Sequence, residues 1–125
     1  MNNLPSDKTT AIEDLKNLLR SFRDARNWKQ FHTPKNLSNA ISIEASELME
    51  HFLWKTDADI DELLKDPLVQ SEIEEELADI LCFCLNLANV LNVDIAQAVT
   101  DKIKKNDKKY PVEKAKGQHT KYNKL

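Results

Sequence analysis

The amino-acid sequence predicts an all-α protein, a bundle of four helices that forms oligomers through helix packing. Three observations lead to this expectation. The chain of 125 residues has a single glycine, no stretch sustains the alternation of polar and apolar residues that a strand requires, and the four prolines fall between the proposed helices or at the start of one. This length suits one domain over residues 1–125, with a flexible arm at 1–9 and a basic tail at 112–125.

Capping signals predict where the helices begin. Thr10 and Glu13 have the spacing of a capping box, while Thr33 and Asp66 each precede a proline that suits a first helical turn. Asp94 is the expected N-cap of the last helix. The polar connector after the second helix has room for one short helical turn. On these signals we expect helices over residues 10–27, 34–54, 68–91 and 95–109.

Composition excludes several classes of protein. No apolar run approaches the roughly 18–20 residues that cross a membrane, and no secretory signal is recognised at the start. Cys82 and Cys84 lie two residues apart on a predicted helix, so their side chains diverge and we expect core thiols rather than a disulfide. The acidic overall balance, with net charge −3, does not suit nucleic-acid binding. We therefore expect a cytoplasmic protein with no membrane or nucleic-acid partner.

The charges are distributed unevenly along the chain. From Glu44 to Asp79 there are thirteen acidic residues and two lysines, a local balance of −11, whereas from Asp101 onward nine lysines face three acids, a balance of +6. Two solvated surfaces of opposite charge are one interpretation. The sharper hypothesis is a cation site in the middle of the chain and an anion site near its end.

Four acidic residues fall on helix faces that must also pack. On a helical projection Glu44 and Glu47 lie between two apolar blocks of the second helix, and Glu76 and Asp79 have the same relation to apolar residues of the third. Ionised carboxylates are costly to bury unless a cation accompanies them. With helix axes about 8–10 Å apart, the two pairs can share one cluster of oxygens.

Such an oxygen-only cluster favours a hard cation. We expect Mg²⁺, which keeps part of its water shell and readily accepts substrate phosphates as ligands. The cluster has room for more than one ion, and Mn²⁺ is able to substitute. A single pair of acids with this spacing is more often a solvated helix face, but two pairs on successive helices favour a metal site.

The last long helix carries a row of the opposite charge. Lys102, Asn106 and Lys109 are spaced at i, i+4 and i+7, and Tyr110 follows them. Lysines at the margin of a core often only extend their charge to solvent. Near an acidic metal site, however, the row suits a polyphosphate. No glycine-rich phosphate loop is present.

The connector before the second helix holds Trp28 and His32. These side chains either close the end of a helix bundle or stack on a ligand, and the residues themselves do not decide between the two.

Four segments together resemble a known family. They read WKQFHTPKNL, ISIEASELMEHFLWKTD, EEELADILCFCL and KIKKNDKKYP. With this order and separation the chain is similar to the all-α nucleoside triphosphate pyrophosphohydrolases of the MazG superfamily, in the dCTP pyrophosphatase-like branch. The resemblance implies that Mg²⁺ is bound by Glu44, Glu47, Glu76 and Asp79. It also implies substrate-binding roles for Trp28, His32, Trp54, Phe83, Lys102, Asn106, Lys109 and Tyr110.

Within that resemblance, Lys102 and Asn106 would hold phosphates, and Trp28 and Trp54 would border the base. The chain departs from the animal members of the branch at two positions, since Leu19 and Phe83 stand where those enzymes place a histidine and a tyrosine. Because of these departures the resemblance does not determine which base is preferred. The four expected metal ligands are unaffected.

The function expected from these observations is Mg²⁺-dependent hydrolysis of a nucleoside triphosphate, such as dCTP, to the monophosphate and pyrophosphate. No activated serine or cysteine is apparent, so water is the expected nucleophile, with Glu47 orienting or deprotonating it. A bundle of this size leaves apolar surface exposed, so we expect a dimer or a dimer of dimers. The alternatives are a related enzyme acting on dUTP or a modified nucleotide, and a non-catalytic helical module that docks a basic partner.

Overall fold

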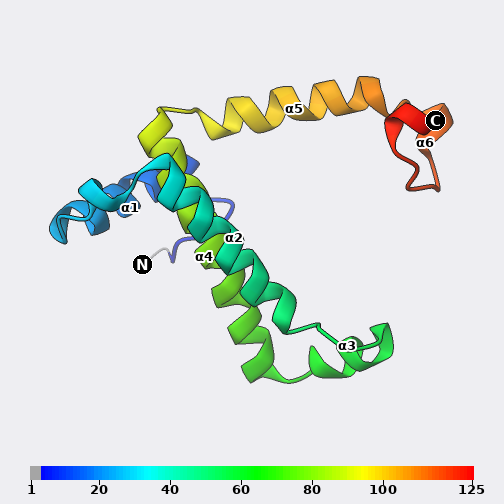
Figure 1. Ribbon diagram of the computed structural model, residues 1–125, viewed down its shortest axis with the longest axis horizontal. Coiled ribbons are helices and arrows are strands. Elements are labelled where there is room, and N and C mark those ends of the chain that lie inside the picture. Colours follow the sequence, from blue (N-terminus) through cyan, green and yellow to red (C-terminus); the bar gives the residue numbers. More distant parts are fainter. Residues whose placement is uncertain (1–3) are drawn as a thin grey trace. The chain divides into compact units, whose positions relative to one another are not determined.

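The computed structural model describes residues 4–125, and the regular secondary structure of these residues is helical (Figure 1). The described part contains six α-helices, two short 3-10 turns and no strand, which confirms the predicted fold class. It divides into two compact units, one that ends at Asn92 and one that runs from Val93 to Leu125. The elements are α1 (Ile12–Ala25), η1 (Lys29–Phe31), α2 (Pro34–Glu50), α3 (Asp57–Leu63), α4 (Pro67–Leu91), α5 (Ile95–Lys109), α6 (Val112–Ala115) and η2 (Tyr122–Lys124).

Side-chain caps begin three of the long helices where the sequence predicted them. Thr33 Oγ1 accepts a hydrogen bond from the backbone N–H of Asn36 at 3.2 Å, and Asp66 and Asp94 cap α4 and α5 in the same way. The predicted cap at Thr10 is wrong. Ala11 occupies the cap position instead, because the Asp14 carboxylate accepts a hydrogen bond from the Ala11 N–H at 2.9 Å.

The second helix ends earlier than predicted, at Glu50 rather than Trp54. After Glu50 the chain forms tight turns, in which the N–H groups of residues 51–53 each bond three residues back, as from Phe52 to the Met49 carbonyl at 3.0 Å. Trp54 then adopts a left-handed backbone with φ of 63°. A bulky residue rarely adopts this conformation, and it redirects the chain towards α3.

In the first unit α2 packs along α4, and α1 packs against α4 as well. Leu37 of α2 and Ala88 of α4 are the fully buried apolar residues of the described chain, at 2% and 3% exposed. Asn89 ties α1 to α4 by donating from Nδ2 to the Lys16 carbonyl at 3.2 Å. The packing of α2 on α4 is what places their inward carboxylates opposite each other.

The second unit holds α5 and the basic tail. The tail is more ordered than a loose extension, since it contains α6 and η2. Tyr110 and Tyr122 meet edge to face with ring centroids 6.0 Å apart, and Lys109 Nζ lies 4.9 Å from the Tyr122 ring. This aromatic pair attaches the end of the chain to the end of α5.

Among the described helices, no single one is both long enough and apolar enough to cross a membrane. The helices α4 and α5 meet the criteria of length and composition only when taken together, with a break between them. Cys82 and Cys84 are both free thiols, as predicted, although each is only partly buried.

Candidate metal centre and adjoining pocket

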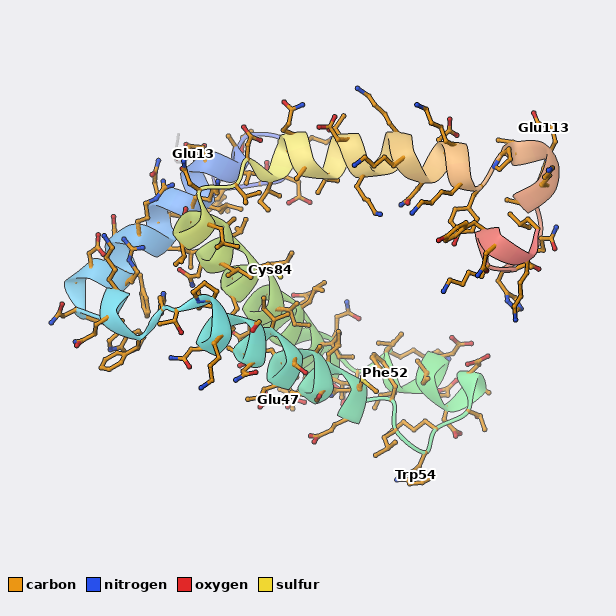
Figure 2. All side chains as sticks on the ribbon, turned by 45° about the horizontal axis from the view of Figure 1, so that its top comes forward. Glu13, Glu47, Phe52, Trp54, Cys84 and Glu113 are labelled. Carbon is orange, nitrogen blue, oxygen red and sulfur yellow. The ribbon has the colours of Figure 1, made fainter. Side chains whose placement is uncertain are left out.

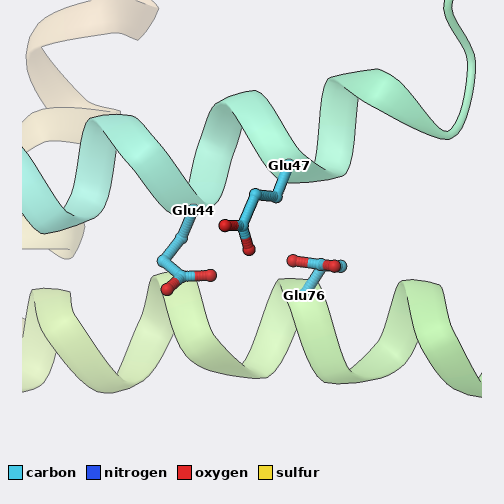
Figure 3. A group of neighbouring side chains, drawn as sticks. All are labelled: Glu44, Glu47 and Glu76. Atoms are coloured by element: carbon cyan, nitrogen blue, oxygen red, sulfur yellow. The ribbon is translucent and has the colours of Figure 1, made fainter.

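Three carboxylates converge between α2 and α4. Figure 3 shows Glu44 and Glu47 reaching from α2 towards Glu76 on α4. One oxygen from each residue lies within 4.8 Å of the others. The Oε2 atoms of Glu44 and Glu76 are buried and have no hydrogen-bond partner. The sequence predicted these three side chains to face one another, and their geometry is that of a cluster that could hold a cation.

Burial and mutual repulsion oppose ionisation of the cluster. Burial raises the pKa of Glu44, and the neighbouring Glu47, Asp79 and Glu76 raise it further. Burial likewise raises the pKa of Glu76, reinforced by Glu47 and partly opposed by His51. Each shift means that the folded protein resists holding these groups as unpaired anions.

The donor set fits Mg²⁺. All the converging atoms are carboxylate oxygens, the ligand type that hard cations prefer. Two oxygens bound to one Mg²⁺ are at most about 4.2 Å apart, given metal–oxygen distances of about 2.1 Å. The three oxygens lie within 4.8 Å of one another, so small side-chain rotations would bring them onto one ion. Asp79 is not among the three converging residues, so its role as a ligand stays a prediction.

The raised pKa values predict how stability depends on pH without metal. Above the ordinary glutamate pKa of 4.5, the folded chain retains protons on Glu44 and Glu76 that the unfolded chain has lost. The free energy of unfolding contributed by these residues should therefore fall as the pH rises through that window. Urea unfolding of the metal-free protein at stepped pH would measure it, with the double variant Glu44→Gln, Glu76→Gln as the reference. Identical pH profiles for the two proteins would contradict the prediction.

His51 adjoins the cluster at the end of α2. Its Nε2 lies 3.7 Å from Glu76 Oε1. The two residues line a pocket of about 530 Å³ together with Glu47, Glu50, Lys55, Leu63, Val69 and Glu72. The pocket opens directly beside the candidate metal site, which gives solvent access to the carboxylates.

A second, more apolar pocket of about 370 Å³ lies between α1, the connector and α4. It brings together Trp28, His32 and Phe83, three residues that the sequence predicted to bind substrate. Asp79, one turn beyond Glu76 on α4, also lines it and so joins it to the carboxylate cluster. The full lining is Leu18, Leu19, Phe22, Arg23, Trp28, His32, Asp79, Cys82, Phe83 and Asn86.

Trp28 and His32 form one side of this pocket. The Trp28 ring meets Phe22 edge to face at 5.7 Å and stays 44% exposed, which leaves part of its surface free for stacking. Burial and the nearby positive charge of Arg23 lower the pKa of His32. His32 Nδ1 is buried without a hydrogen-bond partner. This arrangement favours the ligand-binding interpretation of the connector over simple closure of the bundle.

Sequence reasoning missed Arg23 and Asn86 as pocket residues. A signal was available for Arg23, which lies one helical turn after Leu19 and thus on the apolar face of α1. Asn86 lies in the apolar part of α4, where a buried amide requires an explanation.

Trp54 lies elsewhere. Its side chain is 94% exposed, and Figure 2 shows it projecting from the turn after α2. It lines neither of the two pockets within this chain. The structure does not bring Trp54 together with Trp28, so its contact with a base stays a prediction.

The predicted phosphate-binding residues belong to the second unit. Lys102, Asn106 and Lys109 are exposed on α5, and Tyr110 follows at its end. The structure shows them on one element, and their role towards the site in the first unit stays a prediction.

Comparison with known proteins assigns the chain to a family. A family model described as MazG-like matches residues 39–125, which include all three converging carboxylates. The chain belongs to the MazG-like family. Within it, the chain is 38% identical over 114 residues to dCTP pyrophosphatase 1 of Rattus norvegicus and 37% identical to that of Homo sapiens, covering 91% of this chain and 67% of each relative. These matches place it in the dCTP pyrophosphatase-like branch.

A solved structure agrees with this placement. The crystal structure of a pyrophosphatase from Archaeoglobus fulgidus superimposes with a TM-score of 0.76 at 40% sequence identity. The match covers 87% of this chain and 99% of that protein. The MazG-like fold expected from the resemblance is thereby confirmed.

Proposed function

We propose that this MazG-like protein is a Mg²⁺-dependent nucleoside triphosphate pyrophosphatase that converts dCTP to dCMP and pyrophosphate. The observation that carries the proposal is the carboxylate cluster of α2 and α4, which adjoins an aromatic pocket through Asp79. Relatives named dCTP pyrophosphatase, at 37–39% identity, support both the reaction and the base.

In the proposed complex, the substrate spans the pocket and the cluster. The base lies between Trp28 and Phe83, and the α-phosphate reaches the carboxylates beside Asp79. Glu44, Glu47 and Glu76, joined by Asp79, would hold the metal. When bound, Mg²⁺ supplies positive charge against the phosphates and lowers the pKa of a coordinated water.

The chain's own residues then direct the hydrolysis. Glu47 is the exposed member of the cluster, so it is placed to orient the attacking water and take its proton. The water oxygen bonds to the α-phosphorus, and the bond from that phosphorus to the bridging oxygen breaks. Pyrophosphate leaves with the bonding electrons. Lys102 and Asn106 are proposed to hold the terminal phosphates, and the exposed Lys109 and Tyr110 extend that surface.

We further propose that the enzyme is a homo-oligomer, a dimer or a dimer of dimers in the cytoplasm. Large apolar side chains are exposed on both long helices of the first unit, among them Ile43 and Met49 of α2 and Leu68 and Leu81 of α4, each more than half exposed. With so little apolar surface buried in one chain, a second copy is the partner that covers these faces. Light scattering should therefore give a multiple of the 14.4 kDa chain mass. A monomer at micromolar concentration would contradict this.

A panel of nucleotides tests the proposed function. With Mg²⁺ present, we expect dCTP to give the highest kcat/KM for pyrophosphate release among dCTP, dUTP, dTTP and a 5-modified deoxycytidine triphosphate. Preference for dUTP would move the assignment to another base within the family. No pyrophosphate from any nucleotide would contradict the proposed function.

A further inference from the structure

The aromatic pocket contains polar groups whose purpose the fold does not explain. Of the residues that line it, Leu18, Leu19, Phe22 and Phe83 carry no hydrogen-bonding group. A base held there would be recognised through the few polar side chains that remain. Two of these, Arg23 and Asn86, are among the most buried polar residues of the described chain.

Arg23 is a donor with unused capacity. The residue is 8% exposed, yet the structure gives it one polar side-chain partner, the Asp24 carboxylate, to which Nε donates at 2.8 Å. Among the described residues its two Nη groups have no hydrogen-bond partner. A guanidinium presents its donors in a rigid planar fork and stays charged, so it favours a ligand with two adjacent acceptors.

Asn86 is an acceptor with unused capacity. The residue is 7% exposed, and its Oδ1 is buried without a hydrogen-bond partner. Most buried amide oxygens in folded proteins are paired, so the unpaired Oδ1 of a residue that lines the pocket is available to a donor from a bound ligand. Together, Arg23 and Asn86 offer a fork of donors and an acceptor within one cavity.

This set matches one base edge best. Cytosine presents two adjacent acceptors, O2 and N3, followed by the amino group at C4. The Arg23 guanidinium can therefore donate to O2 and N3, while Asn86 Oδ1 accepts from the amino group. Uracil and thymine place an N3–H between two carbonyls, which sets a donor against the guanidinium. Guanine's adjacent acceptors, O6 and N7, have no amine beside them, and adenine has no adjacent pair on its Watson–Crick edge.

We propose that Arg23 and Asn86 are specificity-determining residues that read the polar edge of cytosine in the aromatic pocket. The inference rests on the proposed function, because it identifies how this enzyme would select its base. Trp28 and Phe83 supply stacking that is indifferent to the base, and the two buried polar side chains supply the discrimination.

The first test substitutes Arg23→Met and compares kcat/KM for dCTP and dUTP on the same preparation. We expect the preference for dCTP to fall by about 10- to 150-fold, the range of a hydrogen bond to a charged group. Both substrates are assayed with the same preparation, so a loss of folded protein lowers both kcat/KM values equally and leaves their ratio unchanged. Arg20→Met is the matched control, since Arg20 lies on the same helix, pairs with Glu13 at 2.8 Å and does not line the pocket. An unchanged ratio in Arg23→Met would overturn the proposal.

The second test isolates Asn86. Asn86→Ala should lower kcat/KM for dCTP, but leave unchanged the value for the triphosphate of 2-pyrimidinone deoxyriboside, which lacks the amine at C4. Equal losses on both substrates would show that Asn86 acts on structure alone and would overturn its assignment. If the wild-type protein hydrolyses no nucleotide, the proposed function is wrong. If the wild type is active but the substitutions leave the ratios of kcat/KM between the paired substrates unchanged, the proposed function stands and the role of Arg23 and Asn86 in base selection is wrong.

Discussion

Replacing Glu47 with glutamine is expected to abolish nucleotide hydrolysis while the helices persist. The amide keeps the volume of the side chain but loses both its negative charge and its ability to take a proton. Loss of a general base lowers rates by about 10²- to 10⁴-fold, and weaker metal binding adds to this. Steady-state pyrophosphate release measures the effect, and circular dichroism checks that the helical content is retained.

Glu74→Gln is the matched control for Glu47→Gln. Glu74 is a glutamate of α4 that is exposed to solvent, and it lines neither pocket. The control variant should hydrolyse dCTP at the wild-type rate. If both variants remained fully active, the catalytic role of the cluster would have to be abandoned.

Removing divalent cations is the second change with a large expected effect. A chelator should eliminate turnover, and Mg²⁺ or Mn²⁺ should restore it. The same titration should raise the melting temperature, because the cation relieves the repulsion among Glu44, Glu47 and Glu76 in the folded chain and finds no formed site in the unfolded one. At 100-fold excess over its dissociation constant, the ion adds about 2.7 kcal/mol to the free energy of unfolding.

A variant of the cluster separates this effect from general salt stabilisation. Glu44→Gln removes one buried carboxylate, so its melting temperature should respond less to Mg²⁺ than that of the wild type. A wild-type melting temperature that does not change across the titration would count against a shared metal site.

The sequence predicted the carboxylate cluster better than the aromatic pocket, and the reason is physical. Glu44 and Glu47 are three residues apart on one helix and face Glu76 on another, so helical periodicity and the packing of apolar faces suffice to bring them together. The caps at Thr33, Asp66 and Asp94 were equally readable because capping is a local interaction.

Features that depend on tertiary context were harder to predict. Trp54 continues the apolar pattern of α2, yet the helix stops at Glu50 and the left-handed turn directs the indole to solvent. Arg23 lies on the apolar face of α1, but only the packing of α4 and the connector shows that it lines a pocket. Periodicity assigns a residue to a face of its own helix, whereas a pocket is defined by what the neighbouring elements bring to that face.

The most direct test of the central claim is the fate of oxygen during hydrolysis. In the proposed complex the base occupies the aromatic pocket, so the α-phosphate, rather than the γ-phosphate, would lie at the carboxylates. Hydrolysis of dCTP in ¹⁸O-labelled water with Mg²⁺ should therefore put the label in dCMP and none in pyrophosphate, as mass spectrometry would show. Release of labelled orthophosphate with accumulation of dCDP would contradict the account.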